Sequence, residues 1–450
     1  MNDLLQDAAR RAIAYLDSLD ERSVSPSPEA VTGLARLQKP LPENPTSPEV
    51  VLNDLDEICS PATMAMGSPR FFGFVIGGAL PVTLAANWLA GAWDQNSAYH
   101  APTPATAVLE SIALEWLLDL LGLPATSGGG FVTGATMANF TALAAARHAV
   151  LQQVGWNVEA DGLIGAPPIT VIVGDEAHPT LFKSLGLLGL GRNRVVRVPV
   201  DRQGRIKPES MPSIAGPTII CSQAGNINSG AFDPIGEMCK RAHAEGAWVH
   251  VDGAFGLWAM AVPELSHLTA GMAKADSWAT DFHKWLNVPY DSGIAIVRDK
   301  NSLQAAMAIS ADYLPPESSF RNPSDFTPEL SRRARGVEVW AALRALGREG
   351  VRDLVERTCG HARSFAKGLS EAGYEVLNEV VLNQVTVAFG DDETTRQIIR
   401  EIQAEGTCWC GPTIWQGRTA MRISVSGWAT TEKDVDRCLE VMLRIAGQNC

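Results

Sequence analysis

The sequence of 450 residues lacks the marks of most specialised protein classes. Charged residues make up only 19% of it, and acidic residues outnumber basic ones by 50 to 37. The resulting net charge of −13 argues against a general nucleic-acid binder, because such proteins need a basic surface to neutralise phosphates. The remaining composition, 46% hydrophobic, is typical of a globular protein with two or three domains.

Cysteine is scarce and irregularly spaced. The eight cysteines include no C-x-x-C pair, and Cys408 and Cys410 lie too close together for the usual zinc or redox motifs. We interpret them as buried small side chains in a reducing cytosol, and we expect no metal site. The first 23 residues mix acids and bases and predict an amphipathic helix, not a signal peptide. A cytoplasmic location is therefore expected.

Long apolar runs are missing except at residues 73–93. This stretch carries no charge and is long enough to cross a bilayer. However, it contains Pro81, Thr83, Asn87 and four glycines, and it is the one such segment in the sequence. We therefore favour a buried helix over a membrane span.

The order of predicted elements divides the chain into three parts. Residues 1–60 predict helices joined by a Pro-rich connector, "SVSPSPEA" and "KPLPENPTSPE". From about residue 105, β-branched runs such as "ITVIVGDEAH" and "AWVHVDGAFG" alternate with helices, which indicates a largely parallel sheet. A Pro- and Ser-rich stretch follows residue 310. We expect a helical segment at 1–60, a large domain at 61–310 and a small domain at 311–450.

Ligands bind parallel sheets at the carboxyl ends of the strands, so the polar residues after each apolar run are the candidates for function. "FVTGAT" places small residues at 134–136 before a helix, and His178 and Asp252 each follow or end an apolar run. Lys284 lies in "DFHKWL". A desolvated lysine there would be a nucleophilic amine, whereas a surface loop lysine would have no such role. Each feature is weak alone, and neither G-x-G-x-x-G nor a P-loop motif is present.

Taken in order, these motifs resemble pyridoxal 5'-phosphate (PLP) enzymes of fold type I, and among them the group II amino-acid decarboxylases. The resemblance runs through "SPRFFGF", "FVTGATMANFTAL", "DEAHPTLFKSLGLLGLG", "HVDGAFG", "DFHKWLNVPYDSG" and "MRISVSGWATTEKDVDRCLEVM". It implies an α/β fold with a mostly parallel seven-stranded sheet flanked by helices. An N-terminal helical segment and a small α+β C-terminal domain complete this fold.

The resemblance also implies roles for individual residues. Lys284 would form the Schiff base with PLP, Asp252 would pair with the pyridine nitrogen, and His178 would stack on the ring. Ala254 would press on the other ring face. The phosphate would be held by a group of four residues: Gly134, Ala135, Thr136 and His283.

The reaction and substrate are less well determined. Arg422 matches an arginine that the family uses near the substrate carboxylate, although a surface salt bridge is the alternative. Phe72 is a candidate for contact with the substrate side chain, with core packing as the alternative. Asn226 and Ile227 stand where many relatives have two threonines, and a carbon–carbon lyase branch carries Asn in a similar place.

The loop at residues 314–330 contains no tyrosine. Relatives that act on aromatic amino acids use a tyrosine there to return a proton to Cα, and Tyr313 is the nearest candidate here. The predicted function is a PLP-dependent L-amino-acid decarboxylase, which the resemblance implies is a homodimer. A carbon–carbon lyase, an aldehyde-forming decarboxylase and a non-catalytic relative stay open as alternatives.

Overall fold

A computed structural model describes residues 1–309 and 320–449 and divides the chain into two compact units. Unit 1 comprises residues 1–78, 361–377 and 385–450, and unit 2 comprises residues 79–360 and 378–384. The domain limits expected at residues 60 and 310 stay a prediction.

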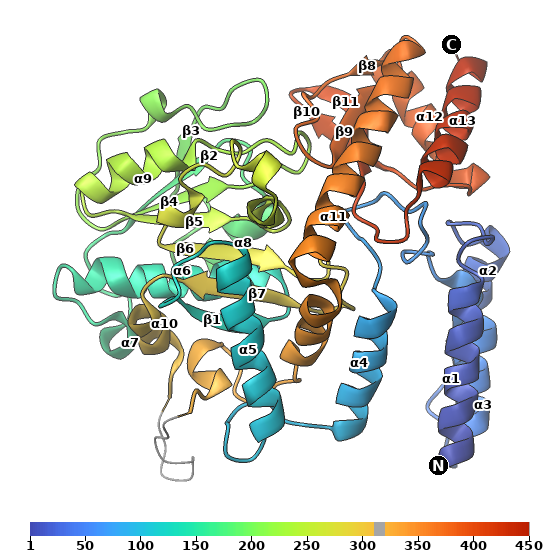
Figure 1. Ribbon diagram of the computed structural model, residues 1–450, viewed down its shortest axis with the longest axis horizontal. Helices are drawn as coiled ribbons and strands as arrows, with labels where there is room; N and C mark the ends of the chain where they lie inside the picture. The colour runs from blue at the N-terminus through green and yellow to red at the C-terminus, as the bar shows by residue number, and fades with distance from the viewer. Residues whose placement is uncertain (310–319, 450) are drawn as a thin grey trace. The chain divides into compact units, whose positions relative to one another are not determined.

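Unit 2 contains the predicted seven-stranded α/β sheet (Figure 1). The strand order is β1-β7-β6-β5-β4-β2-β3. β7 runs antiparallel to both of its neighbours, and the other strand pairs are parallel. The strands are β1 Gly128–Val132, β2 Thr170–Gly174, β3 Val196–Val198, β4 Thr218–Gln223, β5 Trp248–Asp252, β6 Ser277–Asp281 and β7 Gly293–Val297.

Helices pack on this sheet and explain why most of its strands are buried along their whole length. All five residues of β1, β5, β6 and β7 are buried, as expected for strands that have both faces covered. Helix α6 (Ala135–Gln152) packs against β1, β5, β6 and β7, and it also contacts α8 and α10. The other helices are α4 Pro81–Trp93, α5 Pro104–Leu120, α7 Val158–Asp161, α8 Pro179–Leu187, α9 Ile235–Ala244 and α10 Lys300–Met307.

Unit 1 combines the N-terminal helices with a small four-stranded sheet. The helices α1 (Asn2–Asp17), α2 (Pro28–Gly33) and α3 (Pro48–Asp54) contain no buried residue. The sheet has the order β10-β11-β9-β8. Its strands are β8 Glu375–Val376, β9 Gln384–Ala388, β10 Gly411–Trp415 and β11 Arg418–Ser424, and the C-terminal helices are α12 Asp392–Glu405 and α13 Glu432–Gln448. Helix α11 (Gly336–Glu371) passes from unit 2 into unit 1 and has non-helical backbone at Gly347.

Two stretches that were uncertain in the sequence have defined structures. Residues 73–80 are irregular, and the apolar run forms only the 13-residue helix α4. Within residues 1–309 and 320–449, no helix combines the length and the apolar character that a bilayer span requires. In the described part of the Pro-rich stretch, Pro323–Phe326 form a 3₁₀ turn with Phe326 buried. Tyr313 lies outside the described residues.

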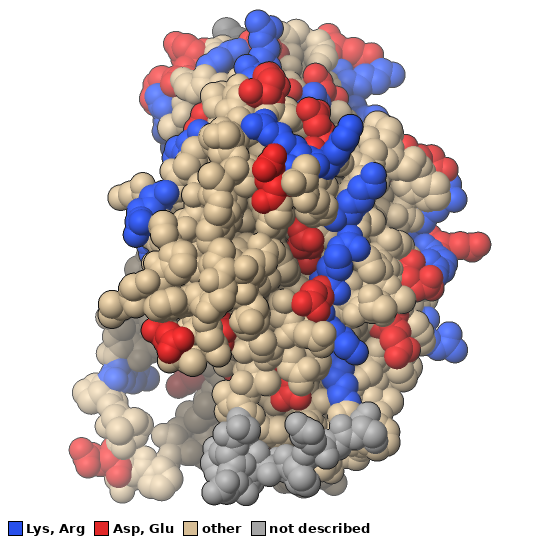
Figure 2. Space-filling model, turned by 90° about the vertical axis from the view of Figure 1, so that its left-hand side faces the viewer, with Lys and Arg blue, Asp and Glu red and all other residues tan. Residues whose placement is uncertain are grey.

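Charged side chains of both signs are interspersed on the face of the molecule drawn in Figure 2. A column of lysine and arginine runs down this face, with aspartate and glutamate beside it.

Candidate active site

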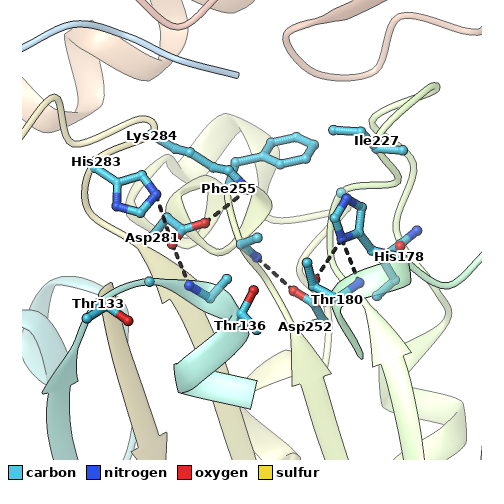
Figure 3. A pocket seen from close by; sticks show the side chains of 15 residues that line it. Thr133, Thr136, His178, Thr180, Ile227, Asp252, Phe255, Asp281, His283 and Lys284 are labelled. Carbon is cyan, nitrogen blue, oxygen red and sulfur yellow. Dashed lines mark hydrogen bonds and ion pairs between the residues drawn. The ribbon is translucent and has the colours of Figure 1, made fainter. Parts of the chain in front are cut away.

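A cavity of about 290 Å³ lies at the carboxyl ends of β1, β2, β4, β5 and β6 in unit 2. These strands point the same way, so their ends meet at one edge of the sheet. In the view of Figure 3, Asp281 and His283 lie on one side of the cavity and His178 and Ile227 on the other. The lining residues are Thr133, Gly134, Ala135, Thr136, His178, Thr180, Gln223, Gly225, Ile227, Asp252, Ala254, Phe255, Asp281, His283 and Lys284.

Lys284 lines this cavity and is mostly shielded from solvent. Its side chain is 17% exposed, and Nζ lies 2.9 Å from Oδ2 of Asp281, which is 3% exposed. The surface-loop alternative considered for Lys284 is therefore wrong. Lysine is rarely buried without a partner. The partner of Lys284 is Asp281, which stands three residues earlier in the chain.

Asp281 joins three parts of the site. Besides the ion pair with Lys284, its Oδ1 accepts the N–H of Ala135 at 2.5 Å and lies 3.3 Å from Nε2 of His283. Ala135 is the first residue of α6, where backbone N–H groups lack helical partners and favour negative charge. Asp281 therefore links the start of the helix to the lysine that faces the cavity.

The orientation of His283 follows from its two ring nitrogens. Nδ1 accepts the backbone N–H of Ser292 at 3.0 Å, so in the neutral ring Nε2 carries the proton and points at Asp281. The ring stacks on Tyr290 with 4.2 Å between centroids. Burial lowers the pKa of His283 below its ordinary value, although Asp281 opposes this shift.

Asp252 ends β5, and its carboxylate is held from two directions. Oδ2 accepts an N–H of Asn139 at 3.1 Å, and Oδ1 accepts the backbone N–H of Ala254 at 3.3 Å. Burial raises the pKa of Asp252, while His178, Lys284 and the Asn139 hydrogen bond act in the opposite direction. A cation in the cavity would stabilise the ionised form further.

His178 caps the start of α8, and its ring is fixed by Thr180. Nδ1 lies 2.7 Å from Oγ1 of Thr180 and 3.4 Å from its backbone nitrogen. The following Pro179 supplies the fixed φ that suits a first helical position. The same residues that begin the helix thus hold the imidazole at the cavity.

The lining fits PLP. Gly134 has φ +151°, and a Cβ atom there would lie 2.8 Å from Cε1 of His283, so only glycine leaves this corner open. Thr136 and the start of α6 offer a hydroxyl and N–H groups to an anion. An amine, a buried carboxylate and an imidazole complete a donor set that matches the aldehyde, ring nitrogen and ring face of this cofactor.

Three other predicted site residues are not among those that line this cavity. Asn226 is buried, donates to Glu176 at 3.1 Å and accepts the backbone N–H groups of Asn228 and Ser229, while its neighbour Ile227 lines the cavity. Phe72 and Arg422 belong to unit 1.

The surroundings of those two residues in unit 1 differ. Phe72 is fully buried and meets Phe365 edge to face at 5.1 Å, which fits the core-packing alternative. Arg422 lies in β11, and its buried Nε has no hydrogen-bond partner among the described residues. Burial lowers the pKa of Arg422 to about 10.

Sequence reasoning missed Asp281 and Phe255, and of the pair Asn226 and Ile227 it chose Asn226, whereas Ile227 lines the cavity. Asp281 could have been found, because it ends a strand just as Asp252 does and stands three residues before the lysine. Phe255 carried no signal, since an apolar residue after a strand does not differ from a core residue in the sequence.

Solved structures show which class of fold this is. A rice structure described as TDC with PLP and tryptamine superimposes with a TM-score of 0.90 at 23% sequence identity, covering 99% of this chain and 97% of that one. The fold is therefore that of the fold type I PLP enzymes, and the predicted fold class is confirmed.

Sequence comparison then places the chain within that class. Residues 31–389 match the pyridoxal-dependent decarboxylase conserved domain, so the chain belongs to this family. It is 26% identical to an aromatic-L-amino-acid decarboxylase from Bacillus atrophaeus, over 99% of this chain and 94% of that protein. It is 28% identical to an L-2,4-diaminobutyrate decarboxylase from Rhizobium meliloti (strain 1021), over 92% and 85%. The protein is a PLP-dependent amino-acid decarboxylase, and the predicted activity and cofactor are confirmed.

Proposed function

We propose that this enzyme removes CO₂ from an L-amino acid with an apolar or aromatic side chain, that Lys284 carries its PLP, and that it acts in the cytoplasm. The observation that carries the assignment of the site is the convergence of Lys284, Asp252 and His178 on one cavity. A fold of this class needs no such set for its own stability. The non-catalytic alternative would leave the shielded amine of Lys284 without a purpose.

Each of these residues would have a distinct task. PLP supplies an electron sink for the bond that breaks. Asp252 would keep a proton on the ring nitrogen, and His178 would hold the ring in place by stacking. Lys284 would hold the cofactor through its ε-amine and release it to the amine of the substrate. Asp281 would then hold the freed lysine close to the reacting carbon.

The proposed substrate class rests on the apolar part of the lining. Ile227 and Phe255 border the same cavity as Lys284, and they would favour an apolar or aromatic group over a carboxylate. Arg422 stays the proposed ligand of the substrate carboxylate. Its guanidinium is buried, and its Nε–H has no hydrogen-bond partner among the described residues, which suits the binding of an anion.

The products distinguish simple decarboxylation to an amine from the aldehyde-forming reaction and from carbon–carbon bond cleavage. PLP-loaded protein is incubated with each of the twenty L-amino acids in air and under nitrogen, and CO₂ and products are measured by mass. Equal amounts of CO₂ and amine, largest for apolar or aromatic substrates, are the expected result. Aldehyde and ammonia formed only in air would assign the aldehyde-forming reaction. Aldehyde without CO₂ from a β-hydroxylated substrate would assign the carbon–carbon lyase.

A homodimer is also proposed. Helices α1 and α3 have no buried residue and expose Leu5, Ile13 and Val51, which a second copy of the chain would cover. Light scattering after size exclusion should give about twice the chain mass of 48.2 kDa. A monomer at micromolar concentration would contradict this part of the proposal.

A further inference from the structure

Behind Asp252, four buried polar side chains form an unbroken row of hydrogen bonds. Nε1 of Trp248 donates to Oγ of Ser277 at 2.9 Å, and this oxygen lies 2.9 Å from Nδ1 of His250. Nε2 of His250 lies 2.9 Å from Oδ1 of Asn139, whose Nδ2 donates to Asp252 at 3.1 Å. The row joins β5, β6 and α6 within unit 2.

Hydrogen-bonding capacity sets the direction of this row. An indole nitrogen can only donate, so the Ser277 oxygen accepts from Trp248 and its own hydrogen is free to donate to His250 Nδ1. At the other end, a carboxylate can only accept, so the Asn139 amide presents nitrogen to Asp252 and oxygen to His250. His250 must then donate from Nε2.

We propose that His250 is a positioning residue for Asp252: as the neutral Nε2–H tautomer, it fixes the Asn139 amide so that an N–H group always faces the carboxylate. This proposal rests on the role proposed above for Asp252 at the ring nitrogen. Without the His250 donor, the Asn139 oxygen loses its partner in the row, and the amide is held from the side of the carboxylate alone. The N–H group that faces Asp252 would then be less well ordered, and the carboxylate would be held less firmly.

The surroundings support a fixed neutral ring. His250, Asn139 and Ser277 are each fully shielded from solvent, so no water competes for their hydrogen bonds. Burial lowers the pKa of His250 to about 3. The ring therefore stays neutral at any pH at which the enzyme would work, and the direction of the row does not change.

Two substitutions distinguish the hydrogen bonds of His250 from the space that its ring fills. In His250→Gln, the side-chain amide can still donate to Asn139 and accept from Ser277. In His250→Leu, both hydrogen bonds are lost, although the leucine side chain is similar in size to histidine. His361→Leu is the matched control, since His361 is a buried histidine in unit 1 whose Nε2 contacts Thr430.

The first readout needs no cofactor. Nitrogen-15 NMR of histidine-labelled protein should show His250 as the neutral Nε2–H tautomer from pH 5 to pH 8. A charged ring or an Nδ1–H tautomer in that range would overturn the proposal. Because this result is independent of activity, it stays decisive even if the proposed roles of the site residues fail.

The second readout follows the ring nitrogen of bound ¹⁵N-PLP. We expect His250→Leu to move this signal toward that of the unprotonated nitrogen and to lower kcat at least tenfold, with KM within twofold. His250→Gln should keep the wild-type signal and stay within threefold in kcat, and His361→Leu should leave the signal unchanged. An unchanged signal and a kcat within threefold in His250→Leu would overturn the proposal.

Discussion

Replacing Asp252 with asparagine tests the electronic role of the site most sharply. The variant keeps the shape of the side chain and an oxygen that can accept from Asn139, so the local hydrogen bonding survives. It removes the negative charge that would hold a proton on the ring nitrogen. The fold and much of the cofactor binding should therefore persist, while the rate of CO₂ release falls.

The size of the effect is estimated from Coulomb's law for a carboxylate in contact with a charged ring nitrogen. A carboxylate and a pyridinium at ~3 Å attract each other by roughly 5 kcal/mol at an effective dielectric of about 20. Desolvation opposes this attraction, as the raised pKa of Asp252 indicates. If about half of it survives as stabilisation of the transition state, the loss of about 2.7 kcal/mol corresponds to roughly a hundredfold decrease in kcat.

The assay measures CO₂ release at saturating substrate for the wild type, Asp252→Asn and a control. Asp299→Asn is a suitable control, because asparagine replaces aspartate well at a helix start and Asp299 caps α10. The control should retain wild-type kcat. A decrease of tenfold or less in Asp252→Asn, with PLP still bound, would refute the role assigned to this carboxylate.

Three further substitutions follow from the structure. Glu110→Gln should lower the free energy of unfolding by about 3–5 kcal/mol, measured by urea denaturation, because it leaves the buried Arg332 guanidinium, 2.6 Å from the carboxylate, without its counter-ion. Gly134→Ala should lower PLP affinity at least tenfold in an absorbance titration, because its Cβ would collide with His283; unchanged affinity would contradict the phosphate site. His250→Gln should alter stability in acid. The wild-type His250 pKa of about 3 lies below the unfolded value of about 6.5, so the unfolded state binds the extra proton as the pH falls below 6.5. Between pH 8 and pH 5 the wild type should lose about 2 kcal/mol more than His250→Gln, and equal losses would contradict a neutral buried ring.

Much of the large sheet could be predicted because its strands leave a clear pattern. Runs such as residues 248–252 are apolar and β-branched, and the polar residue at each end marks the edge where a cavity forms. Asp252, His178 and Lys284 were found in this way, and the structure places all three around one cavity. Their proposed roles stay a prediction.

Other features depend on contacts that a sequence does not display. Asn139 and His250 lie inside a helix and a strand, where the pattern marks only burial, and their hydrogen bonds join segments more than a hundred residues apart. Asn226 was chosen because it stands where many relatives have threonine, but its side-chain oxygen accepts hydrogen bonds from its own loop. The direction of a side chain is decided by the turn around it, which residue type alone does not specify.

Covalent trapping shows whether Lys284 is the residue that carries the cofactor. PLP-loaded protein is reduced with borohydride, digested and examined by mass spectrometry for a pyridoxyl-modified lysine. We expect the label on the peptide that contains Lys284 and none in Lys284→Ala treated in the same way. A label on another lysine in the wild type, or no label on a protein that binds PLP, would contradict the account.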